Sequence, residues 1–278
     1  MKTTITIFVL VLLFISQGFA QDQAPNKKES RKGTMYIYWG WNRGWFSDSD
    51  VSFKGDDYDF TLYDLLAKDR QSEFGWDPYF MIKKLTIPQY NLRLGYFFHE
   101  NYSISFGVDH MKYVMVQNQT VKISGTIDTS YSPKYGDSYD NEDLLVANDF
   151  LLFEHTDGLN YLNIEVRRYD ELYSIGKVSL NVTEGIGAGM LMPKTNATFI
   201  GHERNDEFHV AGFGIGAVVG LNLTFYKYFF IQSEFKAGYI NMPNIRITPN
   251  PADIASQDFW YTQLNVVFGV KYNFTAGK

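Results

Sequence analysis

The 278-residue sequence contains no cysteine. A chain without thiols forms neither a disulfide framework nor a thiolate metal site, so its stability must come from a packed core or from closure of a sheet. Beyond its first twenty residues the sequence also lacks an apolar run of the roughly 20 residues that a transmembrane helix needs. The formal net charge is −6. A negative chain is a poor partner for nucleic acid, and we predict none.

Residues 1–20 have the features of a secretory signal peptide. Lys2 precedes an apolar run over residues 5–15, and small residues occupy the positions at which a signal peptidase cleaves. The run is too short to span a bilayer as a helix. We expect the mature chain to begin at Gln21, with residues 21–33 as a flexible periplasmic tail.

Eight later segments alternate apolar or aromatic residues with small or polar ones. In the second segment, Leu92 and Leu94 alternate with Asn91 and Arg93. Such alternation over about ten residues is typical of a strand with one face toward lipid and the other toward a lumen. The segments cover residues 35–42, 89–96, 102–109, 161–167, 178–190, 212–223, 229–239 and 260–274.

The connections between these segments fall into two length classes that alternate along the chain, as periplasmic turns and outer loops do in bacterial barrels. We therefore predict an all-β fold, an antiparallel eight-stranded transmembrane β-barrel over residues 34–274. It should have short periplasmic turns, long extracellular loops and both termini in the periplasm, with residues 275–278 as a C-terminal tail. The short connections are 98–101, 170–176 and 226–228, and the long ones are 44–87, 115–158, 193–207 and 241–257.

Aromatic residues gather near both ends of the segments, as the two interfaces of a bilayer select. A soluble β-sandwich or lipocalin-like barrel is the alternative. It would turn the apolar faces inward and leave the glycine-rich faces in water, where glycine weakens a strand. The short-turn end carries Tyr96, Phe97, Tyr102, Phe225, Tyr226, Tyr228, Phe229, Tyr272 and Phe274, and the long-loop end carries Trp39, Trp41, Tyr113, Tyr239 and Trp260.

The closing segment Phe268-Gly269-Val270-Lys271-Tyr272-Asn273-Phe274 resembles the C-terminal assembly signal of outer-membrane barrels. The resemblance implies recognition by the barrel assembly machinery through Gly269, Tyr272 and Phe274. Strand count and topology resemble the class of outer membrane proteins A and W over the whole mature chain. This implies a place in the cell outer membrane, among its lipids and lipopolysaccharide, but no activity.

Charged residues at inward positions should fill the lumen. Eight strands enclose just enough room for side chains, so a general pore is not expected. Each charge needs a partner in a low dielectric, and we interpret the set as an ion-pair network that plugs the barrel. Its predicted members are Arg93, Asp109, Glu165, Arg167, Glu234, Lys236 and Lys271.

Inward glycines on the fifth and sixth segments lie opposite large residues on other segments. Small residues opposite large ones can be explained by complementary packing, which is the simpler interpretation. The alternative is a crevice, open toward the long loops, that would take one acyl chain or another slender ligand. The crevice would be lined by Gly185, Gly187, Gly189, Gly212, Gly214, Gly216, Tyr36 and Tyr38.

The first long loop contains a possible helix start and an acidic cluster. Thr61-Leu62-Tyr63-Asp64 matches a capping box and predicts a short helix through about Lys68. Asp56, Asp57 and Asp59 could bind Ca²⁺, but their spacing is not that of a calcium loop, and a solvated acidic turn is favoured. We predict no metal site and no cofactor.

The second long loop is acidic and carries Asp137, Asp140, Glu142 and Asp143. Such a surface repels phosphate, so contact with lipopolysaccharide would need divalent cations or a partner's basic patch.

No catalytic residue is predicted. Asp109 and His110, with Lys112, form the one compact acid-base cluster. Neighbouring residues of a strand point to opposite faces, which favours an interfacial position for His110 instead. Glu184 falls on the lipid-facing side, so either a bulge turns it inward or it contacts another subunit.

Three functions stay open at this point. The first is a structural or surface-interaction barrel, the second a binding site or conduit for small apolar ligands, and the third a lipid A-modifying enzyme.

Overall fold

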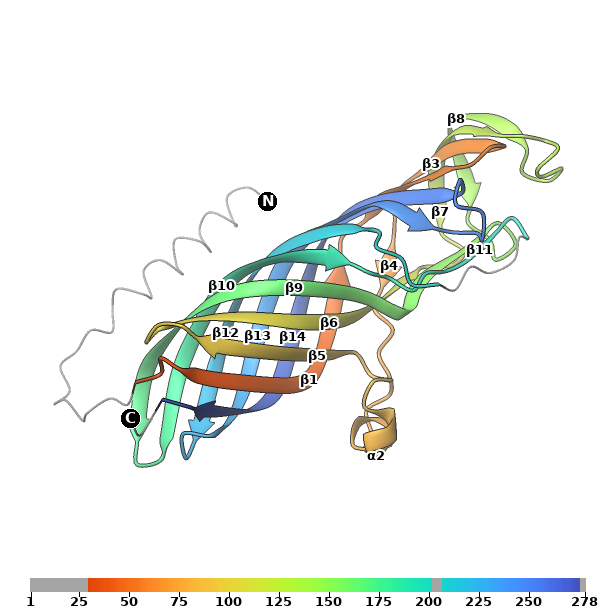
Figure 1. Ribbon diagram of the computed structural model, residues 1–278. Coiled ribbons are helices and arrows are strands. Elements are labelled where there is room, and N and C mark those ends of the chain that lie inside the picture. Colours follow the sequence, from red (N-terminus) through yellow and green to blue (C-terminus); the bar gives the residue numbers. More distant parts are fainter. Residues whose placement is uncertain (1–29, 202–206, 276–278) are drawn as a thin grey trace.

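The computed structural model describes residues 30–201 and 207–275 (Figure 1). The expected signal peptide, most of the expected N-terminal tail, five residues of the 193–207 loop and the last three residues lie outside the described residues. Among the described residues, no helix combines the length and apolarity that crossing a membrane would require.

Almost all regular structure is strand, and many strands continue far beyond the predicted segments. The elements are β1 Thr34–Phe46, β2 Ser49–Lys54, β3 Tyr58–Leu65, β4 Ala67–Lys68, α2 Trp76–Tyr79, η1 Ile82–Lys84, β5 Tyr90–Phe97, β6 Tyr102–Met115, β7 Thr120–Ile127, β8 Asp137–Leu145, β9 Leu151–Ile175, β10 Val178–Leu191, β11 Asn196–Phe199, β12 Gly212–Phe225, β13 Phe229–Arg246 and β14 Ile254–Asn273.

Eight of these strands close into an antiparallel barrel. The order is β1, β5, β6, β9, β10, β12, β13 and β14, and β14 pairs again with β1, from Thr34 opposite Asn273 to Phe46 opposite Tyr261. Closure leaves no unpaired edge in the wall, which is what a lipid environment requires of a sheet. The predicted antiparallel eight-stranded barrel is confirmed.

The barrel is apolar outside and polar inside. Along β5, Leu92 and Leu94 are exposed on the outer face, while Asn91 and Arg93 are buried in the lumen. The same alternation runs through the other barrel strands. A soluble barrel would show the reverse, so this is the fold of a transmembrane outer-membrane barrel.

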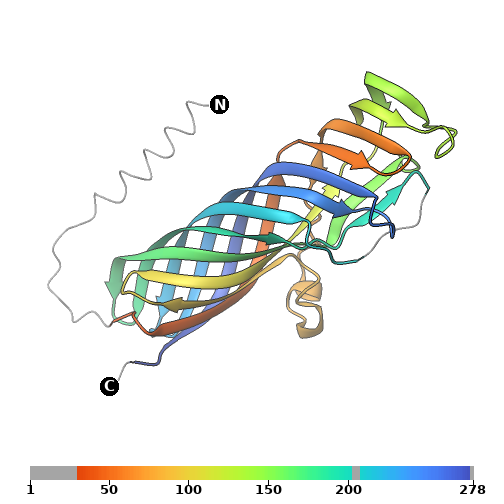
Figure 2. The same ribbon diagram turned by 45° about the horizontal axis from the view of Figure 1, so that its top comes forward.

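The long connections are mostly strand, and they build a folded head at one end of the barrel (Figures 1 and 2). The head comprises β2, β3, β7, β8, β11 and the ends of β9, β13 and β14 beyond the barrel. From the barrel wall the sheet continues through β14, β2, β3 and β7 to β8. Its apolar core includes Val51, Phe53, Phe60, Leu62, Ile123, Phe150, Phe153, Phe199 and Ile245.

The predicted helix from Thr61 to Lys68 is wrong. This stretch belongs to β3 and β4, and Tyr58, Phe60 and Leu62 are buried at alternate positions of β3. The period of two, reinforced by pairing with β2 and β7, outweighs the local capping pattern.

Other expectations differ in detail. Strand β9 continues to Ile175, so the expected 170–176 turn is only Gly176 and Lys177. Phe97 and Tyr113 do not belong to the aromatic residues expected at the two membrane interfaces, because both side chains point into the interior and are buried.

The expected tail ends in an ordered stretch at the short-turn end. The Arg31 guanidinium donates to the Tyr169 carbonyl at 2.9 Å and to Asn181 Oδ1 at 2.5 Å, and the Arg31 amide donates to Glu100. Asn273 Nδ2 donates to the Ser30 carbonyl at 2.7 Å, so both ends of the described chain meet at this end of the barrel.

Glu184 points outward, and no bulge turns it into the lumen. It lies opposite Arg168 of β9, whose side chain is also exposed. The register shift in this hairpin falls at Leu180 and Asn181, short of Glu184. The outward Arg168 opposite the Glu184 carboxylate makes the position of that carboxylate on the outer wall less unfavourable.

Candidate functional site: the buried charge network of the lumen

Six of the seven predicted lumen charges meet in one network at mid-barrel. They come from β5, β6, β9 and β13, and all six side chains are almost fully buried. Each occupies an inward position because of the strand period. Three are cations and three are anions, so the set is neutral: Arg93, Arg167 and Lys236 against Asp109, Glu165 and Glu234.

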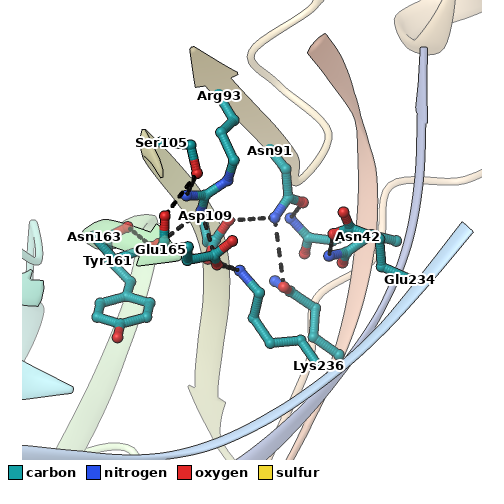
Figure 3. Close-up of polar contacts among 12 residues, drawn as sticks. Asn42, Asn91, Arg93, Ser105, Asp109, Tyr161, Asn163, Glu165, Glu234 and Lys236 are labelled. Atoms are coloured by element: carbon teal, nitrogen blue, oxygen red, sulfur yellow. Dashed lines mark hydrogen bonds and ion pairs between the residues drawn. The ribbon is translucent and has the colours of Figure 1, made fainter. Parts of the chain in front are cut away.

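Glu165 is the centre of the network. One oxygen accepts from Lys236 Nζ at 2.7 Å and lies 3.0 Å from Arg93 Nη2. Its other oxygen accepts from Arg167 Nε at 2.6 Å. Arg93 and Lys236 thus approach the same carboxylate from opposite walls of the barrel (Figure 3). A trans-lumen arrangement compensates charges that the neighbouring strand cannot.

Asp109 forms the loop-side part of the network. Lys236 Nζ donates to it at 2.6 Å, and the amides of Asn91 and Asn163 donate at 2.5 and 3.0 Å. The Arg93 guanidinium is 3.7 Å away. Both oxygens of this carboxylate therefore have hydrogen-bond partners inside the barrel.

Glu234 forms the short-turn side. Its carboxylate accepts a hydrogen bond from Arg167. It also accepts hydrogen bonds from Asn265 Nδ2 at 3.0 Å and from Gln232 Nε2 at 2.5 Å. The Tyr38 hydroxyl accepts from Arg93 at 3.0 Å and from Arg167 at 3.1 Å, so it joins both guanidinium groups.

Lys271 lies outside this network. Its ammonium donates to Thr224 Oγ1 at 3.1 Å, near Arg31 at the short-turn end. Lys271 shares the inward parity, but it is too close to the strand end to reach the central carboxylates. A recess here, lined in part by Arg31, Tyr36 and Lys271, has room for about one water molecule.

Two apolar layers enclose the network. Toward the short turns, Tyr36, Phe97, Tyr169, Phe230 and Val267 form a buried cluster that includes Tyr38. Toward the head, the head core continues into the barrel mouth through residues such as Leu159, Tyr161, Leu191 and Tyr261. The charge network therefore lies between two layers of buried side chains.

Large side chains lie against the glycine wall, where the alternative interpretation of the sequence placed a crevice. A Cβ added at Gly185 would lie 2.7 Å from Arg167 Cγ, and one at Gly187 would lie 2.5 Å from Glu165 Cγ. At Gly214 the nearest atom, at 3.0 Å, belongs to the Tyr161 ring.

The remaining glycines and tyrosines named for the crevice also face protein. Cβ atoms added at Gly189 and Gly212 would meet the backbone of the neighbouring strand, and one at Gly216 would meet the Tyr261 hydroxyl at 2.9 Å. Tyr36 packs against Phe97 and Phe230, and Tyr38 belongs to the charge network. These glycines make room for network side chains and close strand contacts.

The candidate catalytic and metal groups are dispersed. His110 is on the outward parity, but it is covered: its ring stacks on Tyr90 at 4.9 Å and its Nδ1 pairs with Asn160 at 2.8 Å. Asp56, Asp57 and Asp59 lie exposed at the β2–β3 turn, with Asp59 3.6 Å from Lys54. The described part of the chain holds no cluster of three or more His, Cys, Asp or Glu side chains suited to a metal ion.

Sequence reasoning missed the neutral members of the network. Asn91, Asn163, Gln232 and Asn265 share the inward parity with the charges, and that parity was the signal that could have identified them. Arg31 had no such signal because it precedes the first alternating segment.

Comparisons with solved structures return small outer membrane proteins. The chain is similar to the outer membrane protein OprG from Pseudomonas aeruginosa, with 10% identity, a TM-score of 0.41, and 88% of this chain and 98% of that chain covered. For the outer membrane protein AlkL the identity is 10%, the TM-score 0.39 and the coverage 93% and 99%. For the outer membrane protease OmpT from Escherichia coli the values are 8%, 0.30, 90% and 100%. No family model and no curated protein matches the sequence.

Proposed function

We propose that this protein is a closed outer-membrane barrel that holds a folded head at the cell surface for contact with other surface molecules. The observation that carries the proposal is the continuous sheet from the barrel wall through β14, β2, β3 and β7 to β8. Such a platform is rigidly fixed to the membrane. The filled lumen and the filled glycine wall favour this function over a ligand conduit.

The free edge of β8 suggests the kind of contact. Within the described residues, β8 pairs with β7 on one side only, so its other edge offers backbone N–H and C=O groups. An open edge accepts an added strand from a partner. Asp140, Glu142 and Asp143 of β8 are exposed, so a basic partner strand is favoured and pairing between identical edges is opposed.

The proposal places the head outside the cell and both termini in the periplasm. Because the chain has no cysteine, one introduced residue is a unique label site. We expect Asp140→Cys to react with a membrane-impermeant maleimide on intact cells, and a cysteine appended after Lys278 to react only after lysis. Labelling in the opposite order would contradict this orientation.

The closed lumen predicts electrical silence. We expect wild-type protein to give no steady conductance in planar bilayers, and Arg93→Ala/Glu165→Ala to give one. This double variant empties space at mid-barrel and keeps the charge balanced, with the Lys236–Asp109 and Arg167–Glu234 pairs retained.

The matched control is Arg168→Ala/Asp170→Ala, which removes a pair on the outer wall. It should remain silent. A steady conductance of the wild-type protein would refute the closed barrel and would favour a channel function instead.

We also propose assembly by the barrel assembly machinery through Gly269, Tyr272 and Phe274. Tyr272 and Phe274 are exposed on the outer face at the short-turn end. Gly269 faces inward, where an added Cβ would lie 2.3 Å from the Phe230 ring.

A further inference from the structure

The segment between β4 and β5 leaves the barrel wall and exposes an unusual amount of apolar surface. It carries α2 and η1, and α2 stands off the outer side of the barrel where the head begins (Figures 1 and 2). Phe74 is 80% exposed, Trp76 75% and Ile82 87%. The other large exposed apolar residues of the segment are Phe80, Met81 and Ile87.

One side of this segment is attached to the lipid-facing wall. The rings of Tyr79 and Phe80 each lie 5.5 Å from the Trp41 ring. Trp41 in turn lies 5.0 Å from Trp39 and 5.8 Å from Phe268. These three wall residues occupy outward positions of β1 and β14. The apolar side chains of the segment therefore continue the lipid-facing surface of the barrel without a break.

One hydrogen bond within the connection and one to barrel strand β6 hold the segment in this place. Tyr79 is buried, and its hydroxyl donates to the Ser72 carbonyl at 3.0 Å. Lys112 Nζ donates to the Ile87 carbonyl at 2.7 Å. The exposed side chains are thus directed away from a fixed base, and the head core is packed without them.

Cationic groups border the apolar surface. Lys83 and Lys84 follow Ile82 directly, and Lys84 lies 2.6 Å from Asp77. On the neighbouring wall, Arg43 lies over the Trp45 ring at 5.6 Å. Aromatic and aliphatic side chains with adjacent lysines are the composition of elements that lie in a membrane interface.

We propose that residues 74–87 form an interfacial anchor in the leaflet on the head side of the membrane. Phe74, Trp76 and Ile82 lie among the acyl chains, and Lys83 faces headgroups that carry a net negative charge. In the proposed orientation this is the outer leaflet. Lipid is the occupant because the surface is continuous with a wall that lipid already covers. The anchor enlarges the membrane footprint on the β1–β5 side and holds the head close to the membrane there.

Spin labelling of single cysteines tests the proposal in reconstituted vesicles of phosphatidylcholine and phosphatidylglycerol. The label is placed at Ile82→Cys, with Ile186→Cys on the lipid-facing wall and Asp59→Cys on the head as controls. All three side chains are exposed, so the substitutions spare folding. We expect the ratio of oxygen to water-soluble nickel accessibility at Ile82 to exceed that at Asp59 several-fold and to approach that at Ile186.

Two results would overturn the anchor. A ratio at Ile82 equal to that at Asp59 would place the segment in water. A label inaccessible to both reagents would place it against protein, such as a second copy of the chain. For the headgroup contact, adding Lys83→Glu should lower the ratio at Ile82 in the anionic vesicles and leave it unchanged in pure phosphatidylcholine. An equal ratio with and without Lys83→Glu in both lipids would refute that contact.

Discussion

Replacing Arg167 with Gln is expected to destabilise the barrel by about 3–5 kcal/mol, the cost of breaking a buried ion pair by removing one partner. Arg167 is fully buried and bonds to Glu165, Glu234 and the Tyr38 hydroxyl. Glutamine is too short and lacks the charge to compensate both carboxylates. Urea unfolding in lipid vesicles measures the loss.

Arg168→Gln is the matched control one residue away. Arg168 points outward, is 43% exposed and pairs with Asp170, which is 33% exposed. The expected change is at most about 1 kcal/mol, as for other exposed pairs. Equal losses for the two variants would show that the lumen is hydrated and the network contributes little.

A double variant separates the ion pair from its surroundings. Glu234→Gln combined with Arg167→Gln removes both charges of one pair, so the combined loss should be smaller than the sum of the two single losses. Additive losses would mean that Arg167 and Glu234 are not coupled and that Glu165 alone explains the effect.

Replacing Phe60 with Ala is expected to destabilise the head by about 3–5 kcal/mol, the range for removing a buried phenylalanine from a core. The Phe60 ring lies 5.1 Å from Phe53, 5.9 Å from Phe150 and 5.8 Å from Phe199, at the centre of the head core. The readout is the rate at which protease added to intact cells cleaves the β7–β8 region. We expect that rate to rise while the barrel keeps its heat-dependent gel mobility.

The barrel should survive because its strand ladder and charge network do not depend on Phe60. Phe208→Ala is the control, since Phe208 is 57% exposed and lies outside the head core. It should leave cleavage at the wild-type rate. Loss of the barrel in Phe60→Ala would show that head and barrel fold as one cooperative unit.

The alternation of residue types accounts for how much of the barrel the sequence could predict. In β5, Arg93 and Leu94 differ in face because the strand period is two, and this holds whatever the strand pairs with. The same rule identified six of the network charges by parity alone. The helix prediction at β3 was wrong because it relied on a capping box, which is a local pattern, whereas the pairing of β3 with β2 and β7 is a long-range constraint.

Parity states which face a residue occupies, but not which residue lies opposite across the lumen. Lys271 and Lys236 share parity, yet only Lys236 reaches Asp109 and Glu165, because the height of a residue in the barrel depends on strand tilt and register. The glycine wall illustrates the same limit, since the side chains against it come from both β9 and β14.

The sequence by itself determined the strand segments, the membrane-facing surface and the composition of the lumen, because these follow from a period of two and from the absence of long apolar runs. Only the tertiary structure decided that the long connections form a head, that Arg167 joins Glu165 to Glu234, and that residues 74–87 lie against Trp41. Those features depend on contacts between residues far apart in the chain, and local patterns carry no information on which distant partners will meet.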